Sequence, residues 1–322
     1  EGLHYFFISQ YKNLNMLNIQ YFRFCLVLIS LWSCVFTNAY YYCNKQKKLC
    51  RNDKHFMCDL DSVPSKGVVL GVLPLTGSMK RLYVDRHNEH RNRIAGGEQK
   101  FGLPSRGYFP KATRMREVIW DDELAYIAGI HAKRCNKQPD DCHSTERFPG
   151  SGQNLYKNET GKPTTGTDMI VYAIDSWWAQ SELVDDGNAM VDEFPKGIGE
   201  PDRSDTTSSI SFDVFIDYGN ETAVQGELPK SPDAWKKIGN FSAIANERAA
   251  FVGCGLAVCH NSTSNAYCIH VTCNYSRTNV IGTFMYKKGN SSASECDYYE
   301  SVPSSKYPHL CKNTGKIFED GK

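Results

Sequence analysis

The chain has 322 residues, of which 41% are apolar and 23% charged, a composition typical of folded globular proteins rather than disordered ones. This length favours one large domain with extensions, or two small domains. Lysine plus arginine number 37 and aspartate plus glutamate 36, so the formal charge is +1. Such a balance lacks the concentrated positive charge of a nucleic-acid binder, and we expect no nucleic-acid partner. Thirteen cysteines and six Asn-x-Ser/Thr sequons exclude a cytosolic protein and indicate an oxidising, glycosylating compartment.

The first 39 residues have the pattern of a processing segment. Residues 1–15 are expected to lie upstream of the true start, and residues 16–39 to form a signal peptide, in which Arg23 precedes the apolar run CLVLISLWSCVF. As a helix this run would span only ~18 Å, too short for a ~30 Å hydrocarbon core, although an uncleaved signal anchor is the alternative. We therefore expect a secreted mature chain without a transmembrane segment.

Hydrophobic periodicity predicts helices followed by strands. The helices are expected over residues 82–94, 120–135 and 167–183, and the strands over residues 251–259, 266–275 and 280–286. About residues 185–232 the chain is rich in Asp, Gly, Ser and Pro without sustained periodicity, which predicts an inserted loop. Helices that precede an antiparallel sheet indicate an α+β or layered α/β/α domain.

Eleven cysteines remain after the signal peptide, and an odd number predicts at least one thiol or intermolecular bond. Cys254 and Cys273, like Cys259 and Cys268, are placed symmetrically about residues 263–264. Opposite residues of an antiparallel hairpin have this symmetry, with Cβ atoms ~5 Å apart, although the symmetry could be accidental. The five-residue spacing puts the two pairs on opposite faces of the sheet unless a bulge intervenes.

Several short motifs occur in an order that is characteristic of one known family. They are His87-Asn88-x-x-Arg91, Trp120-Asp121-Asp122-Glu123-Leu124-Ala125, Gly152-Gln153-Asn154, Val252-Gly253-Cys254-Gly255 and Cys273-Asn274-Tyr275. With these motifs the chain resembles the CAP superfamily of cysteine-rich secretory proteins, antigen-5 venom allergens and pathogenesis-related proteins, and is most similar to the antigen-5 proteins of flies. The resemblance implies a disulfide-braced, three-layer α/β/α CAP sandwich.

The resemblance also implies how the chain is divided. Residues 40–80 are expected to form a cysteine-rich N-terminal extension. Residues 81–290 are expected to form the CAP domain with its inserted loop, and residues 291–322 a cysteine-containing tail.

The disulfide pattern of the family can be carried over where the cysteines match. It implies the pairs Cys43–Cys58, Cys50–Cys142 and Cys254–Cys273, and proximity then adds Cys259–Cys268 and Cys296–Cys311. Relatives carry a further N-terminal cysteine that pairs with the position of Cys135, and this sequence lacks it. Cys135 is therefore expected to be unpaired, as a buried and inert thiol.

Many CAP domains hold a divalent cation with two histidines and two acidic residues, and the resemblance assigns each of these ligands a position here. Those positions are occupied by Pro139, Gln153, Gln180 and Asn240. A proline and three amides make a poor transition-metal site, so we expect neither a metal nor another cofactor. A one-residue shift could recruit Glu182 for Gln180, but it would restore neither histidine.

No catalytic residue is expected. His87 is interpreted as a hydrogen-bonded core residue, and no G-x-S-x-G or H-E-x-x-H motif occurs. The favoured hypothesis is a secreted, non-enzymatic antigen-5-like protein that binds a small lipid or other amphipathic ligand, or an extracellular partner protein. The alternative is a divergent hydrolase or metal-assisted enzyme that would use His87, Glu182 and a histidine outside the family set.

Four sequons lie in turn-like polar stretches and are expected glycosylation sites: Asn158, Asn220, Asn261 and Asn290. Asn240 and Asn274 are expected to be buried and unmodified.

Overall fold

The computed structural model describes residues 41–72, 74–160, 166–196, 237–261 and 265–318. The expected signal peptide, residues 197–232 of the expected inserted loop, and the sequon at Asn220 lie outside the described residues.

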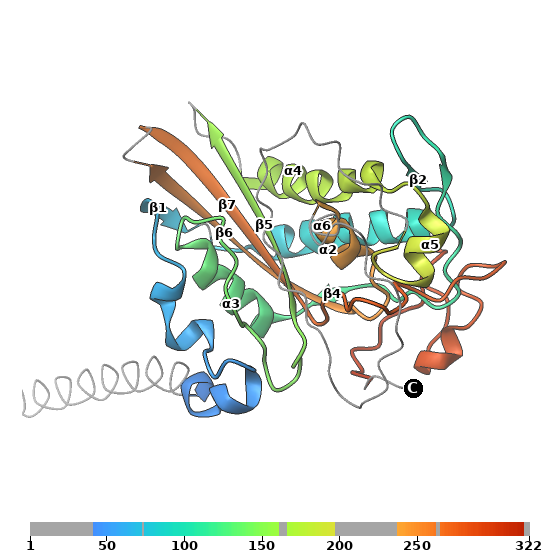
Figure 1. The fold of residues 1–322 in the computed structure, drawn as a ribbon, viewed down its shortest axis with the longest axis horizontal. Coiled ribbons are helices and arrows are strands. Elements are labelled where there is room, and N and C mark those ends of the chain that lie inside the picture. The colour runs from blue at the N-terminus through green and yellow to red at the C-terminus, as the bar shows by residue number, and fades with distance from the viewer. Residues whose placement is uncertain (1–40, 73, 161–165, 197–236, 262–264, 319–322) are drawn as a thin grey trace, which may run out of the picture.

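A five-stranded sheet runs through the centre of the described chain (Figure 1). Its strands lie in the order β1-β6-β7-β5, all antiparallel, and the two-residue β4 pairs in parallel with the start of β6. The bounds are β1 Val68–Val72, β4 Ile119–Trp120, β5 Gly152–Thr160, β6 Phe251–Asn261 and β7 Ala266–Tyr275. The strands β2 (Lys100–Phe101) and β3 (Gly107–Tyr108) form a separate small hairpin.

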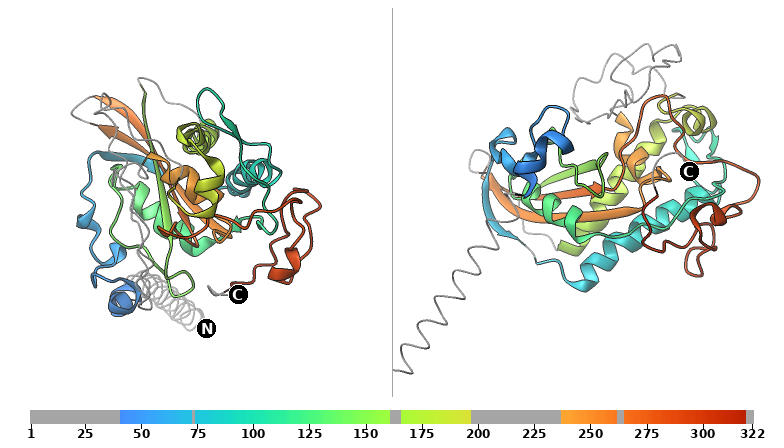
Figure 2. Two further views of the ribbon diagram at one scale, coloured as in Figure 1. Left: turned by 45° about the vertical axis from the view of Figure 1, so that its right-hand side comes forward. Right: turned by 90° about the horizontal axis from the view of Figure 1, so that it is seen from below.

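Helices cover both faces of the sheet, which confirms the expected three-layer α/β/α sandwich (Figures 1 and 2). One face is covered by α3 (Asp122–Ala132), and the other by α2 (Gly77–Ala95), α4 (Gly166–Trp178) and α6 (Gly239–Ala245). The shorter helices are α5 (Gly187–Asp192), η1 (Phe56–Cys58), η2 (Leu60–Ser62), η3 (Ala179–Leu183) and η5 (Cys296–Tyr299). None of the helices in the described ranges is both long enough and apolar enough to span a membrane.

Side-chain caps set where α2 and α3 begin. Thr76 accepts a hydrogen bond from the backbone N–H of Met79 at 3.2 Å, so α2 starts earlier than its apolar pattern predicts. Asp121 accepts from the N–H of Leu124 at 2.9 Å and caps α3, which leaves Trp120 outside the helix in β4. The expected helix over residues 120–135 is therefore shorter at both ends.

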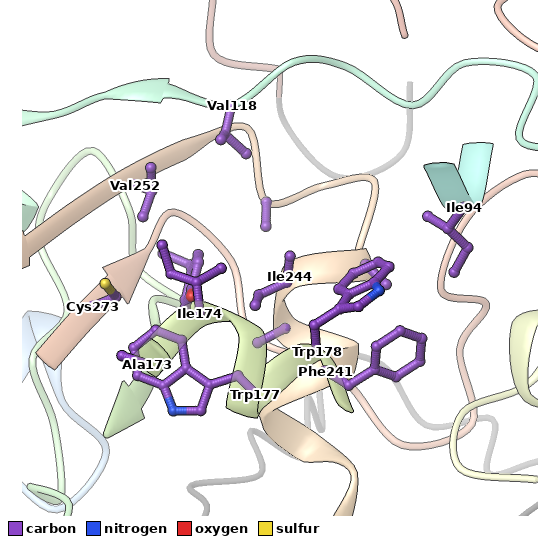
Figure 3. Packing of buried hydrophobic residues seen from close by; sticks show 14 of the residues in the cluster. Ile94, Val118, Ala173, Ile174, Trp177, Trp178, Phe241, Ile244, Val252 and Cys273 are labelled. Carbon is purple, nitrogen blue, oxygen red and sulfur yellow. The ribbon is translucent and has the colours of Figure 1, made fainter. Parts of the chain in front are cut away.

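The main hydrophobic core lies between the sheet and the layer of α2, α4 and α6 (Figure 3). The rings of Trp178 and Phe241 meet edge to face with centroids 4.8 Å apart, a favoured aromatic geometry. Trp177 is almost fully buried, and its indole N–H donates to the carbonyl of Leu155 at 3.1 Å. These contacts hold α4 and α6 against β5.

The segment expected as a strand over residues 280–286 is not a strand. Its backbone bonds instead to the end of α5 and the residues after it: Gly282 N–H donates to Phe194 at 2.7 Å, and Phe194 N–H donates to Thr283 at 2.8 Å. Because these bonds use its polar groups, the segment does not join the sheet. The expected inserted loop is also partly regular, since α5 lies within it.

Five disulfides brace the described chain, and four are the expected pairs: Cys43–Cys58, Cys50–Cys142, Cys254–Cys273 and Cys296–Cys311. The expected Cys259–Cys268 pair and the expected free Cys135 are both wrong. Cys259 is bonded to Cys135, with Cα atoms 5.9 Å apart, and Cys268 is the buried free thiol.

The alternation of side chains along β6 explains the error. Cys254 points into the core beneath α2 and α4, where Cys273 is its neighbour. Cys259, five residues later, points to the opposite face. Cys135 follows the end of α3 on that face and packs there with Ala132 and Ala257.

Two glycines let α3 lie directly on β6. A Cβ atom on Gly253 would come within 2.1 Å of the backbone nitrogen of Ala125, and one on Gly255 within 2.3 Å of the Cα of Gly129. Side chains at these two positions would push the helix off the sheet.

Gly255→Ala is expected to destabilise the fold by about 3 kcal/mol or more, because the new methyl group meets backbone that cannot move aside. Gly129→Ala is the matched control, since a Cβ there meets no atom within 4 Å. It should stabilise α3 by about 0.5–1 kcal/mol. Chemical denaturation measures the free energy of unfolding of both variants. Equal changes in the two variants would show that the close contact between α3 and β6 does not limit stability.

Peptide mapping of the unreduced chain, alkylated after unfolding, should recover a Cys135–Cys259 link and one labelled thiol at Cys268. The thiol should resist labelling in the folded chain, because Cys268 is only 2% exposed and burial raises its pKa. A Cys259–Cys268 link with a labelled Cys135 would contradict this arrangement.

Candidate functional site

The four positions that the resemblance assigns to metal ligands lie around β5, on both of its faces. Gln153 and Asn154 are neighbours on this strand, so their side chains leave it in opposite directions. The amide N–H of Gln153 donates to Asp140 Oδ2 at 2.8 Å and to Asn274 Oδ1 at 3.1 Å. Pro139 directly precedes Asp140 in the chain. Asn154 donates on the other face to the backbone carbonyl of Asn240 at 3.0 Å.

Gln180 lies on this second face, in the helix η3, next to the start of α6. Its Oε1 accepts from the backbone N–H of Phe241 at 3.1 Å, which ties η3 to α6. Asn240 is 6% exposed and is the second residue of that helix. Gln153 and Gln180 thus serve as hydrogen-bonding links between elements, and the strand β5 lies between them.

Beside Gln153 lies a buried ion pair. His143 Nδ1 is 2.7 Å from Asp140 Oδ1, and the two residues are 3% and 1% exposed. Burial alone would raise the pKa of the Asp140 carboxyl, but the charge and hydrogen bond of His143 outweigh it and lower that pKa to about 2. Asp140 is therefore ionised at neutral pH, held between His143 and the amide of Gln153.

Two further histidines surround this pair, and both use their two ring nitrogens in hydrogen bonds. His131 Nε2–H donates to the carbonyl of Gln138 at 3.0 Å, so its Nδ1 accepts from the hydroxyl of Thr272 at 3.2 Å. His55 Nε2–H donates to the carbonyl of Ser144 at 2.8 Å, while its Nδ1 accepts from a backbone N–H. Burial lowers the pKa of both rings, which favours their neutral forms.

On the opposite side of the sheet, His87 belongs to a buried hydrogen-bonded chain. Its Nδ1–H donates to the carbonyl of Tyr83 at 2.7 Å, and its Nε2 accepts from the Tyr275 hydroxyl at 2.9 Å. That hydroxyl accepts in turn from Asn154 at 3.1 Å. Burial lowers the pKa of His87 to about 3, so the ring is neutral and fully bonded within the core.

These bonds decide what the network can do chemically. A metal ligand or a general base needs a free lone pair, and the rings of His55, His87 and His131 have none. Glu182, the acidic residue considered for an alternative enzyme, is exposed on η3, whereas His87 is buried. The structure does not bring those two residues to one site.

Within the described ranges, one group places three potential metal ligands within 4.8 Å of one another: Cys259, Cys268 and His270. The sulfur of Cys259 is already bonded to Cys135, so it is not a thiolate. This oxidised group therefore offers one thiol and one imidazole, fewer ligands than a structural zinc site requires.

Comparison with known proteins identifies the family. A model described as the cysteine-rich secretory protein family, CAP, matches residues 84–275. The chain belongs to the CAP family. The matched region begins within α2 and ends with β7, so it contains both helical layers and the hairpin of β6 and β7.

The relatives include venom allergens and an antigen 5 like allergen of insects. Venom allergen-1 of Aedes aegypti is 28% identical over 301 residues, which cover 92% of this CAP chain and 94% of that protein. Antigen 5 like allergen Cul n 1 of Culicoides nubeculosus is 33% identical over 246 residues, which cover 72% and 90%. The expected similarity to insect antigen-5 proteins is confirmed.

Solved structures show the same fold. The structure of BmVAL-1 matches with a TM-score of 0.53 at 18% identity and covers 74% of this CAP chain and 96% of that one. The crystal structure of Na-ASP-1 matches with a TM-score of 0.52 at 21% identity, over 74% of this chain and 48% of that one.

The ion pair of Asp140 and His143 was not expected from the sequence, although a signal for it exists. The two residues flank Cys142 at a spacing of three residues, and the disulfide to Cys50 holds their segment inside the molecule. Charged residues so close to a buried cysteine must find partners, because an unpaired buried charge is costly.

Asp140→Asn is expected to lower the free energy of unfolding by about 3 kcal/mol at neutral pH, because it leaves His143 without its buried partner. The pKa of Asp140 is lower in the folded chain than its ordinary value of 3.8. Its stabilising contribution is therefore complete above that pH and is lost as the pH falls through about 2.

Urea denaturation at several pH values measures this effect. Asp141→Asn is the control, since Asp141 is the exposed neighbour. Equal destabilisation by the two substitutions would contradict a special role for the buried pair.

Proposed function

We propose that this CAP protein acts outside the cell by binding, not by catalysis, and that it carries a small amphipathic ligand or engages an extracellular partner protein. One observation supports this most. At the positions assigned to the family's metal ligands, the chain has amides and a proline, and the amides of Gln153 and Gln180 are used to join elements of the fold.

An extracellular location is supported by the redox state of the fold. Five disulfides hold the N-terminal extension, the hairpin and the tail in place, and disulfides persist in oxidising compartments. The relatives named as venom allergens support the same location. We propose that residues 16–39 direct export.

The domain division remains part of this proposal. The matched region supports a CAP domain over residues 81–290, preceded by an extension over residues 40–80 and followed by a tail over residues 291–322. The tail packs on the domain: His309 N–H donates to Asn92 of α2 at 2.9 Å.

We also propose glycans at the exposed sequons. Asn290 is exposed, and Asn158 and Asn261 are partly exposed. Asn240 and Asn274 are 6% and 0% exposed, so a glycan at either position would require the fold to open.

Metal analysis tests the choice between binding and metal-assisted catalysis. The secreted chain, stripped of metal and then dialysed against Zn²⁺ or Cu²⁺, should retain far less than one ion per chain. The reason is that the assigned ligand positions hold a proline and three amides, while the nearby rings of His55, His87 and His131 use both nitrogens in hydrogen bonds. His260→Asn, which removes a partly exposed ring outside the buried network, should leave the metal content unchanged.

Retention of one ion per chain would overturn the proposal and favour the metal-assisted enzyme. In that case His143→Asn and Cys268→Ser would show whether the ion sits beside Asp140 or beside the Cys135–Cys259 disulfide.

A further inference from the structure

A cavity of about 740 Å³ lies beside the C-terminal tail, and none of its lining residues belongs to the polar network around Gln153. Its walls come from segments far apart in the sequence: residues 114 and 116, 146–149, 247, 248, 250 and 251, 276–277, 284, 298–299 and 317–318. The volume falls within the range of pockets that bind small molecules. Figure 2 shows the tail (red) folded along the side of the sandwich.

Positive charge dominates the lining of this cavity. Five of its side chains are arginines: Arg114, Arg116, Arg147, Arg248 and Arg277. Only two lining residues are acidic, Glu146 and Glu247. Glu146 is held at the rim by Lys45, whose ammonium group lies 2.9 Å away.

Two of the arginines already have carboxylate partners. Arg114 Nε and Nη2 lie 3.0 Å and 2.9 Å from Glu247 Oε1. Arg147 Nη1 donates to Asp121 Oδ2 at 2.6 Å. The carboxylates of Glu247 and Asp121 are thus in direct contact with Arg114 and Arg147, and within the described residues neither forms an ion pair with Arg116 or Arg248.

Arg116 is the unusual member of the group. It is only 5% exposed, and within the described chain no carboxylate contacts it. Its Nη1 donates to the carbonyl of Lys316 at 3.0 Å, but its buried Nε has no hydrogen-bond partner. Buried polar groups in folded proteins are normally paired, so this N–H leaves Arg116 with unused hydrogen-bonding capacity at the cavity wall, where its guanidinium packs 4.2 Å from the ring centre of Tyr299.

Arg248 offers a second cation at the same cavity. Its guanidinium lies 4.5 Å from the ring centre of Phe284, and within the described residues it forms no ion pair. A guanidinium group favours carboxylate, sulfonate and phosphate oxygens, which it can bind with two parallel hydrogen bonds.

The remaining walls are aromatic. Phe148, Phe251 and Tyr298 line the cavity, and the Arg114 guanidinium stacks 3.9 Å from the ring centre of Tyr298. Such rings favour an apolar or flat body next to the charged group of a ligand.

We propose that this cavity binds a small organic anion that carries an aromatic or other apolar body, with its acidic group at Arg116 and Arg248. The inference rests on the proposed function, a binding protein, and it adds the place and the charge of the ligand. Nothing in it depends on the metal-ligand positions around β5.

Calorimetric titration with three simple probes tests the proposal. Naphthalene-2-sulfonate combines an anion with a flat apolar body, naphthalene-2-sulfonamide is its neutral counterpart, and inorganic sulfate is the anion alone. The sulfonate should bind once per chain, at least about tenfold more tightly than either of the others, because both parts of the cavity contribute. Added salt should weaken it.

Substitutions then locate the site. Arg248→Gln and Arg116→Gln should each weaken sulfonate binding by about tenfold, the loss expected for a hydrogen-bonded charge. Arg93→Gln is the control, since Arg93 is exposed on α2 and does not line the cavity. Because Arg116 also holds the tail, Arg248→Gln decides the question if the Arg116 variant fails to fold.

Equal binding of the sulfonate and the sulfonamide would overturn the role of the arginines. No binding of any probe, or equal loss in the Arg93 and Arg248 variants, would overturn the site itself. These results concern the anion site alone. The proposed function would fail on a different result, the retention of one metal ion per chain, so the two failures can be told apart.

Discussion

The ladder between β6 and β7 is the constraint on which the rest of the structure depends. Gly253 and Gly255 bring the backbone of α3 into contact with one of its faces, while Cys254 is bonded to Cys273 on the other. A single stretch of β6 therefore contacts α3 on one face of the sheet and is cross-linked to β7 on the face that bears the main core. The Cys135–Cys259 disulfide then secures the end of α3 to the same strand.

This rigid centre separates two regions with different roles. Around β5, Gln153 and Asn154 extend the ladder into hydrogen bonds that reach Asp140 on one face and Asn240 on the other. These bonds use the NH2 groups of the two amides and tie β5 to its neighbours on both faces. The arginine cavity lies outside this network, where loops and the tail meet and where charged side chains have kept unused hydrogen-bonding capacity.

The sequence predicts the parts of the fold that local pattern determines. The cysteine symmetry and the turn between them predict β7 with its observed bounds and the register of the hairpin. β5 was missed because its polar residues GQNLYKNET give no apolar alternation. The predicted partner of Cys259 was wrong because the prediction used only the proximity of Cys268 across the hairpin. The sequence does not show that α3 ends beside Cys259 and places Cys135 there. The cavity could not be predicted, since its walls come from seven separate segments.

Native mass spectrometry of the secreted chain, purified without added ligand, tests most directly whether the molecule is a metal-free binding protein. The expected mass corresponds to five disulfides and one thiol, without metal, plus one small organic anion that is released when the chain unfolds. A chain that carries one tightly bound metal ion and no organic ligand would contradict that conclusion.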